Sequence, residues 1–201
     1  TFDDIDFDKL PNKFVLKTNN GSGTNLIVSN KEELNINDVR KKFNKWMKRN
    51  YAYYNALELQ YDRIIPKIIA EEYIEEVDRD LYDYKFLCFN GEVHYCWVDT
   101  DRSTNHSRNV YNLKWELQEW RQKYKNSNDP IKKPENFDNM VNIAKELCKD
   151  FTHVRVDLYN VDGKIYFGEM TFTNANGFQI IEPIEYNLML GELWKLPINK
   201  N

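Results

Sequence analysis

Alternating hydrophobic and polar residues predict three antiparallel hairpins along the chain. The clearest covers residues 154–170, where two alternating runs flank turn chemistry at Asn160 to Gly163. A second is predicted around Asn90-Gly91, because this dipeptide between two β-rich runs is the strongest short hairpin signal. A third joins the β-rich runs 14–18 and 26–28.

Spacings of three and four residues between apolar side chains predict the helices. Such spacing runs from Glu32 to Leu59, a proline at 134 opens a second amphipathic stretch, and the tail from Pro183 to Trp194 is a third. Residues 64–74 are mostly apolar, end near two glutamates and are predicted to form a buried strand. The chain is therefore expected to have an α+β fold dominated by antiparallel strand pairs.

Composition adds limits to this picture. With 201 residues, 41% of them hydrophobic, the chain can bury the core of one domain or of two small ones. A net charge of −4 gives no bulk attraction to nucleic acid, and we expect no nucleic-acid partner. The three cysteines have no metal-binding spacing and are expected to be reduced core thiols.

No targeting or membrane segment is found in the sequence. No apolar run approaches the ~20 residues that a transmembrane helix needs, and there is no signal-peptide pattern. We therefore predict a cytoplasmic protein. The chain starts at Thr1 rather than at a methionine, so we expect a processed or truncated piece of something longer.

The hairpin at 154–170 carries the most suggestive chemistry. Side chains two apart share one face of a strand, so Arg155 and Asp157 point the same way, and pairing across the turn brings Glu169 beside Asp157. Two neighbouring carboxylates repel unless a cation lies between them, and with a phosphate ligand the usual cation is Mg²⁺. The alternative is a surface hairpin in which Arg155 neutralises Asp157.

Three further stretches each allow two interpretations. Lys17 precedes a loop of Gly, Ser and Asn that is suited to wrapping phosphate oxygens, or that forms a plain hairpin turn. The polar stretch 99–108 has two arginines and a histidine for a phosphate or carboxylate, or is a solvent-exposed connection. Glu71 and Glu72 suit hydrogen bonds to an amino group or to ribose hydroxyls, or are the polar end of a strand.

Together these pieces resemble a known family. A strand lysine before Gly21-Ser22-Gly23, the hinge strand 68–74, and Arg155-x-Asp157 paired with Glu169 resemble the ATP-grasp fold. The stretches 14–17, 83–86, 89–91 and 154–159 look like its TupA-like branch, which is named for teichuronopeptide biosynthesis and is often found among capsular polysaccharide genes. The resemblance covers nearly the whole chain.

The resemblance implies a fold of two α+β subdomains that grip ATP between antiparallel sheets. Residues 1–76 would be the lid subdomain with the Gly-rich loop, and residues 77–201 the core subdomain with the metal-binding hairpin.

The resemblance also implies roles for individual residues. The nucleotide-binding set is Lys17, Asn20, Gly21, Ser22, Gly23, Glu71, Glu72, Tyr73, Ile74, Lys85 and Arg155, with Arg155 near the γ-phosphate. The Mg²⁺ ligands are Asp157, Glu169 and Thr171, with Asn174 or Asn176 as alternatives to Thr171, because many ATP-grasp enzymes have asparagine at that position.

The resemblance further implies an ATP- and Mg²⁺-dependent carboxylate–amine ligase that works through an acyl phosphate. Its acceptor would be an anionic or carboxylate group on a glycan or peptide precursor of the cell surface. Lys17 and Arg155 would act in catalysis, and we assign Arg102, His106 and Arg108 to the acceptor from their charge and loop position. ATP-grasp enzymes normally have an additional N-terminal region, which this chain is expected to lack. The alternatives are a sugar-modifying kinase or transferase, and a non-catalytic ATP-binding remnant.

Overall fold

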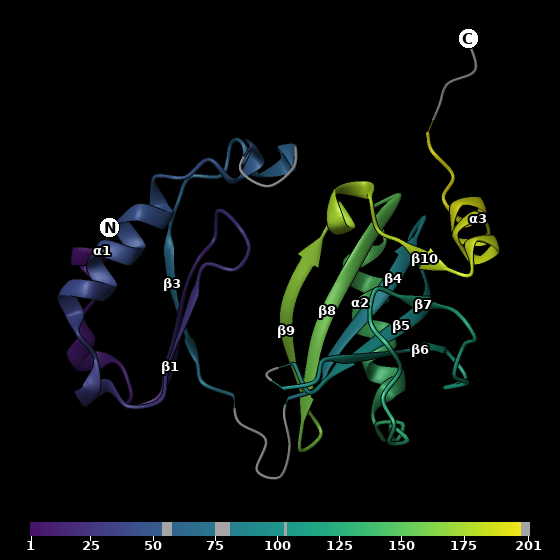
Figure 1. Ribbon diagram of the computed structural model, residues 1–201, viewed down its shortest axis with the longest axis horizontal. Helices are drawn as coiled ribbons and strands as arrows, with labels where there is room; N and C mark the ends of the chain where they lie inside the picture. Colours follow the sequence, from purple (N-terminus) through teal and green to yellow (C-terminus); the bar gives the residue numbers. More distant parts are fainter. Residues whose placement is uncertain (54–57, 75–80, 103, 198–201) are drawn as a thin grey trace. The chain divides into compact units, whose positions relative to one another are not determined.

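The computed structural model describes residues 1–53, 58–74, 81–102 and 104–197 (Figure 1). The chain divides into two compact units, Thr1–Ile74 and Glu75–Asn201. The predicted boundary between residues 76 and 77 lies outside the described residues, and the lid and core roles stay predictions.

The first unit is a three-stranded antiparallel sheet in the order β2-β1-β3, with helix α1 packed against it (Figure 1). Its strands and helix are β1 Phe14–Thr18, β2 Asn25–Val28, α1 Ile36–Met47 and β3 Ile68–Glu72. Its short 3₁₀ turns are Phe2–Asp4, Phe7–Lys9, Lys31–Glu33, Tyr51–Tyr53 and Leu59–Tyr61. The core joins Phe14 and Leu16 of β1 to Phe43 of α1, so the alternation in β1 buries one face of the strand.

The prediction of a single helix from Glu32 to Leu59 is wrong. Helix α1 begins after Asn35, whose side chain accepts a hydrogen bond from the Asp38 N–H, and it ends at Met47. Past that end, the Asn50 side chain accepts from the Ala52 N–H and donates to Asp62. These side-chain bonds offer the backbone an alternative to helical pairing, and they explain why the apolar spacing does not continue as helix.

The strand predicted over residues 64–74 is shorter than expected and is not buried. Strand β3 covers Ile68–Glu72, lies at the edge of its sheet and is exposed from Ile69 onward. The Asn19 side chain accepts from the Lys67 N–H at 2.6 Å and donates to the Ile65 carbonyl at 3.2 Å. The Asn19 N–H also donates to the Lys67 carbonyl at 3.1 Å, so Asn19 takes up both backbone groups of Lys67 just before β3 begins.

The second unit contains a five-stranded antiparallel sheet in the order β6-β5-β4-β8-β9 (Figure 1). Its strands are β4 Asp83–Phe89, β5 Glu92–Thr100, β6 Ser107–Asn112, β8 His153–Val161 and β9 Lys164–Thr171. A separate two-stranded ribbon pairs β7 Arg121–Gln122 with β10 Ile181–Glu182, and the helices are α2 Phe137–Cys148 and α3 Ile184–Leu193, with a 3₁₀ turn at Asn174–Gly177. The predicted hairpins and the two C-terminal helices are confirmed.

The two faces of the five-stranded sheet have different surroundings. One face packs on α2, with Phe86, Val156 and Leu158 against Phe137 and Met140. On the opposite face, a cluster including Leu87, Trp97 and Trp120 joins the sheet to β10 and α3 through Ile181 and Leu190. The remainder of that opposite face carries charged side chains.

The three cysteines, Cys88, Cys96 and Cys148, are free and buried in the core between the sheet and α2, so the prediction of reduced core thiols is confirmed. None of the described helices has both the length and the apolar character needed to cross a membrane.

Candidate functional site

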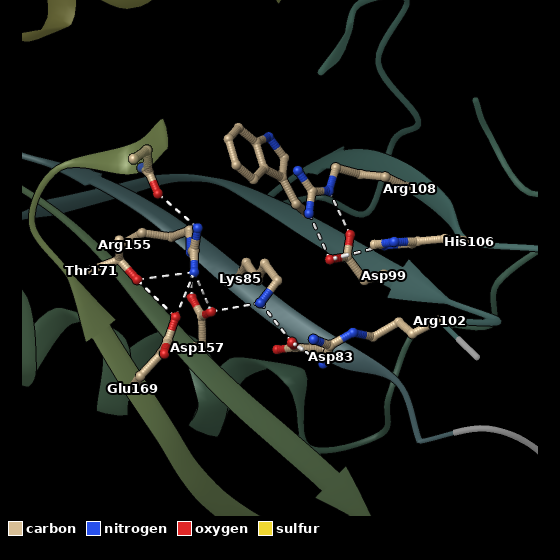
Figure 2. Close-up of polar contacts among 12 residues, drawn as sticks. Asp83, Lys85, Asp99, Arg102, His106, Arg108, Arg155, Asp157, Glu169 and Thr171 are labelled. Carbon is tan, nitrogen blue, oxygen red and sulfur yellow. Dashed lines mark hydrogen bonds and ion pairs between the residues drawn. The ribbon is translucent and has the colours of Figure 1, made fainter. Parts of the chain in front are cut away.

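A row of charged side chains crosses the five-stranded sheet on the face opposite α2, and we call it the charged strip (Figure 2). Its members are Asp83 and Lys85 on β4, Asp99 on β5, Arg108 on β6, Arg155 and Asp157 on β8, and Glu169 and Thr171 on β9. Strand register brings them together, because Asp83 lies opposite Asp99, and Asp157 lies opposite both Lys85 and Glu169.

Arg155 is the centre of the β8–β9 part of the strip. Its Nε and Nη2 atoms donate to the two carboxylate oxygens of Asp157, each at 2.6 Å. Nη2 also donates at 2.9 Å to Glu169 Oε1 and to Thr171 Oγ1, and Nη1 donates at 2.7 Å to Asn174 Oδ1. The predicted convergence of Arg155, Asp157 and Glu169 is confirmed.

The charge on Asp157 is well stabilised although the carboxylate is only 2% exposed. Burial by itself would raise the pKa of Asp157, but Arg155 and then Lys85 outweigh burial and hold the pKa below its ordinary value. Asp157 therefore stays ionised at neutral pH inside a region with little water.

Lys85 links two buried carboxylates of neighbouring strands. Its Nζ atom lies 2.5 Å from Asp83 Oδ2 and 2.6 Å from Asp157 Oδ2. Arg102 reaches the same Asp83 oxygen from the loop after β5, at 2.9 Å. Burial raises the pKa of Asp83, and the negative charge of Asp157 adds to the increase despite Lys85 and Arg102.

The β5–β6 end of the strip is built around Asp99 and Arg108, which are both buried. Arg108 donates to both Asp99 oxygens and to the Gln122 side chain, and its guanidinium carbon lies 4.8 Å from the centroid of the Trp97 ring and 5.1 Å from that of the Tyr124 ring. Strands β5 and β6 extend through Thr100 and from Ser107, so the expected loop at 99–108 is restricted to the residues between them. This guanidinium anchors β6 and the segment after it onto the sheet, and its proposed contact with an acceptor stays a prediction.

His106 lies at the end of this loop beside Asp99 (Figure 2). Its Nε2 atom is 3.3 Å from Asp99 Oδ2, and its ring stacks on Tyr124 with 3.7 Å between the centroids. Burial lowers the pKa of His106 in spite of the neighbouring Asp99. The imidazole is thus mainly uncharged at neutral pH and able to accept a proton.

The predicted nucleotide residues of the first unit form a separate group. Lys17 Nζ pairs with Glu71 Oε1 at 2.5 Å, while Glu72 ends β3 and the Tyr73 ring lies 5.7 Å from Lys13 Nζ. Ile74, the last member of the predicted hinge, is half-buried.

The Gly-rich loop is fixed at both ends. Thr18 and Thr24 bond through backbone and side-chain atoms at its base, and Asn20 Nδ2 donates to the Arg49 carbonyl at 3.2 Å. The loop residues Asn20, Gly21, Ser22, Gly23 and Thr24 line a pocket of about 60 Å³ with Trp46, Arg49 and Tyr51. Asn20 is 5% exposed, and its Oδ1 atom has no hydrogen-bond partner among the described residues.

Sequence reasoning missed several members of these groups. Asp83, Asp99 and Gln122 were not singled out, although Asp83 and Asp99 could have been found by extending the register of the Asn90-Gly91 hairpin. Asn174 entered only as an alternative to Thr171, and the structure places both side chains on Arg155.

The donor set around Arg155 suits one mode of Mg²⁺ binding. Within the described ranges there is no group of three or more His, Cys, Asp or Glu side chains that could hold a metal by itself. Mg²⁺ is usually held by one or two carboxylates together with substrate phosphates. The paired Asp157 and Glu169, with oxygen atoms of Thr171 and Asn174 beside them, fit that mode of binding.

Comparison with known families defines the class of protein: this α+β chain has the ATP-grasp fold. The chain belongs to the family described as TupA-like ATPgrasp, whose model matches residues 1–195. A search of curated proteins gives no match.

Among solved structures, the chain is similar to D-alanine–D-alanine ligase from Helicobacter pylori, with 12% identity and a TM-score of 0.38. The match covers 81% of this chain and 43% of the ligase, so the chain corresponds to less than half the length of that protein.

Proposed function

We propose that this chain is an ATP- and Mg²⁺-dependent carboxylate–amine ligase that acts in cell-surface polysaccharide or peptide biosynthesis. The observation that carries the proposal is the cluster on β8 and β9, in which Asp157, Glu169 and Thr171 converge on Arg155. Family membership supports the nucleotide and the class of reaction. The biological setting is what the sequence resemblance implies.

In this proposal Asp157 and Glu169 would hold Mg²⁺, with Thr171 or Asn174 as the third oxygen donor. The metal, when bound, offsets the negative charge of the phosphates. Arg155 is positioned for the γ-phosphate, because its guanidinium is fixed by two hydrogen bonds to Asp157. Lys85 adds a second fixed positive charge, one strand away. Phosphoryl transfer depends mainly on such positioning and neutralisation.

The first unit supplies the remaining nucleotide contacts in the proposal. Lys17 exchanges its ion pair with Glu71 for a phosphate contact, the backbone N–H groups of residues 20–23 contact phosphate oxygens, and residues 71–74 contact the adenosine. The Lys17 side chain is 32% exposed, so its ion pair is accessible and weak enough to open at little cost.

Arg102 is the most suitable residue in the second unit to receive the acceptor's carboxylate. Its side chain is 49% exposed, and it contacts Asp83 through Nη1 and hydrogen-bonds to Tyr159, which leaves part of its five-donor guanidinium for a ligand. Arg108, in contrast, is buried, and its guanidinium lies near the rings of both Trp97 and Tyr124.

The proposal is tested first by calorimetric titration of ATP into the full chain with and without Mg²⁺. We expect binding that requires Mg²⁺ and that is lost or weakened at least tenfold in Lys17→Ala and Asp157→Asn, which corresponds to about 1.4 kcal/mol or more. The matched controls are Lys9→Ala and Asp150→Asn, which change exposed residues of the same types. Equal binding by Asp157→Asn would contradict the metal assignment, and absence of ATP binding by the folded wild-type chain would contradict the proposal.

The reaction class is tested by trapping. Wild-type chain is incubated with MgATP, hydroxylamine and one of a panel of amino-acid and sugar carboxylates. An acyl phosphate reacts with hydroxylamine to give a hydroxamate, so we expect carboxylate-dependent hydroxamate and ADP in equal amounts. A phosphorylated sugar without hydroxamate would favour the sugar-modifying alternative.

A further inference from the structure

We propose that His106, held by Asp99, is the general base that takes a proton from the attacking amine. This inference rests on the proposed ligase function and adds a chemical step to it. Nothing in the fold or in the family comparison assigns this role, and the sequence alone suggested only that His106 helps to hold the acceptor.

The first argument is the fixed geometry of the His106 ring. Asp99 Oδ2 lies 3.3 Å from Nε2, and stacking on Tyr124 restricts ring rotation. Asp99 is itself fixed, because Arg108 donates to both of its oxygens and the carboxylate is 1% exposed. Nδ1 is the other ring nitrogen. A carboxylate that orients one nitrogen of an imidazole leaves the other nitrogen to exchange protons with a substrate.

The second argument is location. The loop between β5 and β6 places Arg102 on Asp83 and His106 on Asp99, and these two aspartates lie opposite each other on adjacent strands (Figure 2). A carboxylate held by Arg102 would therefore have His106 one strand away. From there the strip continues through Lys85 to Asp157, where the proposal places the transferred phosphate.

The third argument is charge. The groups that face His106 are Asp99 on β5, Arg108 on β6, Tyr124 after β7 and Arg102 in its own loop. Burial and the two arginines favour the uncharged imidazole, while Asp99 stabilises the imidazolium once a proton arrives. A general base needs both properties, because it must be unprotonated before the reaction and must hold the proton afterwards.

In the proposed step the amine arrives as an ammonium, and one of its protons passes to His106 Nδ1. The freed nitrogen forms a bond to the carbonyl carbon of the acyl phosphate. The bond between the carbonyl carbon and the bridging oxygen then breaks, and inorganic phosphate leaves with the electron pair and the second proton of the nitrogen. The products are an amide, phosphate and a protonated His106, which returns its proton to water.

The test compares two nucleophiles in His106→Gln, in the full chain with MgATP and a carboxylate that the wild type converts to a hydroxamate. Hydroxylamine is a strong nucleophile that is mainly unprotonated at neutral pH, so it does not need a base. Ammonium is mainly protonated and does need one. We expect His106→Gln to form the hydroxamate at close to the wild-type rate and to form the amide from ammonium roughly 10²-fold more slowly or worse.

The control is His94→Gln, since His94 lies in β5 and packs edge-on against Phe89 away from the strip. It should leave both reactions unchanged. Equal loss of both reactions in His106→Gln would overturn the base role and show that the residue holds the acceptor or the local fold. No loss in either reaction would also overturn the base role. A wild-type chain that binds ATP but forms no hydroxamate from any carboxylate would contradict the proposed ligase function, and the base role with it.

A second measurement does not depend on catalysis. The ring of His106 is followed by nuclear magnetic resonance as pH changes, and we expect a protonation midpoint below the ordinary value of about 6.5. In Tyr124→Leu the ring loses its stacking partner and is more hydrated, so the midpoint should rise toward that value. A midpoint above the ordinary value in the wild type would mean a histidine that is already charged near neutral pH, and would contradict a base.

Discussion

The two units present their charges in opposite ways. In the first unit, Lys17 and Glu71 form a single ion pair in which both side chains are about one-third exposed or more. In the second unit, Asp83, Lys85 and Asp157 are nearly inaccessible and form an alternating chain of charges with Arg102 and Arg155. Exposed pairs contribute little and open easily, whereas buried charges depend strongly on their partners.

This difference indicates a division of labour under the proposed function. The first unit has charges and backbone groups that can change partners when a nucleotide arrives. The second unit keeps its charges in one arrangement before any ligand binds, which is the preorganisation that electrostatic catalysis needs. The following four predictions test this contrast.

The largest effect is expected from Lys85→Met. The substitution keeps the length of the side chain but leaves Asp83 and Asp157 buried side by side without the cation between them. We expect the free energy of unfolding to fall by about 3–5 kcal/mol. Urea denaturation followed by tryptophan fluorescence measures it, and a loss below about 1 kcal/mol would mean that the strip is hydrated like a surface pair.

Asp99→Asn should show a stability loss that depends on pH. Burial favours a higher pKa for Asp99, but Arg108 outweighs burial and the pKa is lowered, so the ionised form is favoured in the folded chain. The stabilisation is complete above the unfolded value of about 3.9 and is lost as pH falls through the lower folded value. The difference between wild type and Asp99→Asn should therefore be large at pH ~7 and shrink below pH ~4. A difference that does not change between these pH values would contradict this account.

Gly168→Ala tests whether the rigidity of the strip extends to its backbone. A Cβ atom at Gly168 would lie 2.9 Å from the Asp157 carbonyl oxygen, next to the bulge after Asp157. We expect a loss of about 1–3 kcal/mol from overpacking, together with weaker Mg²⁺-dependent ATP binding. Gly191→Ala is the control, because Gly191 lies in α3 with open space around it and should gain up to about 1 kcal/mol.

The smallest effect on stability is expected from Lys17→Met. The pair with Glu71 is partly exposed, so after allowance for solvent screening we expect a change of at most about 1 kcal/mol in the free energy of unfolding. ATP affinity should nevertheless fall, because the proposed role of Lys17 is in binding. A stability loss as large as that of Lys85→Met would remove the contrast between the units.

The hairpins were predictable because their signals are local. Asn90 and Gly91 both adopt positive φ, as the two central residues of a primed turn require, and Asp162 and Gly163 do the same. Side chains alternate between the two faces of a strand, so locating the turn at Asp162 and Gly163 fixes which side chains share a face. The convergence of Arg155, Asp157 and Glu169 could therefore be predicted from the sequence.

The errors arose where distant side chains decide the local structure. Helix α1 stops early because Asn50 bonds to Asp62, and β3 starts late because Asn19 holds the chain at Lys67. Asp83 and Asp99 read as ordinary polar positions of a strand, since their burial depends on the segments that cover the sheet. Their partners, Arg102 and Arg108, lie 19 and 9 residues further along the chain, and no local spacing rule predicts these two pairs.

The three buried thiols make the opening of the core in the second unit measurable. Cys88, Cys96 and Cys148 all belong to the second unit, and the first unit has no cysteine. Burial raises the pKa of Cys96, so its reactive thiolate is scarce while the core is closed. The rate at which a thiol reagent modifies the native chain thus reports how often the sheet separates from α2, with no signal from the unit that contains the Gly-rich loop.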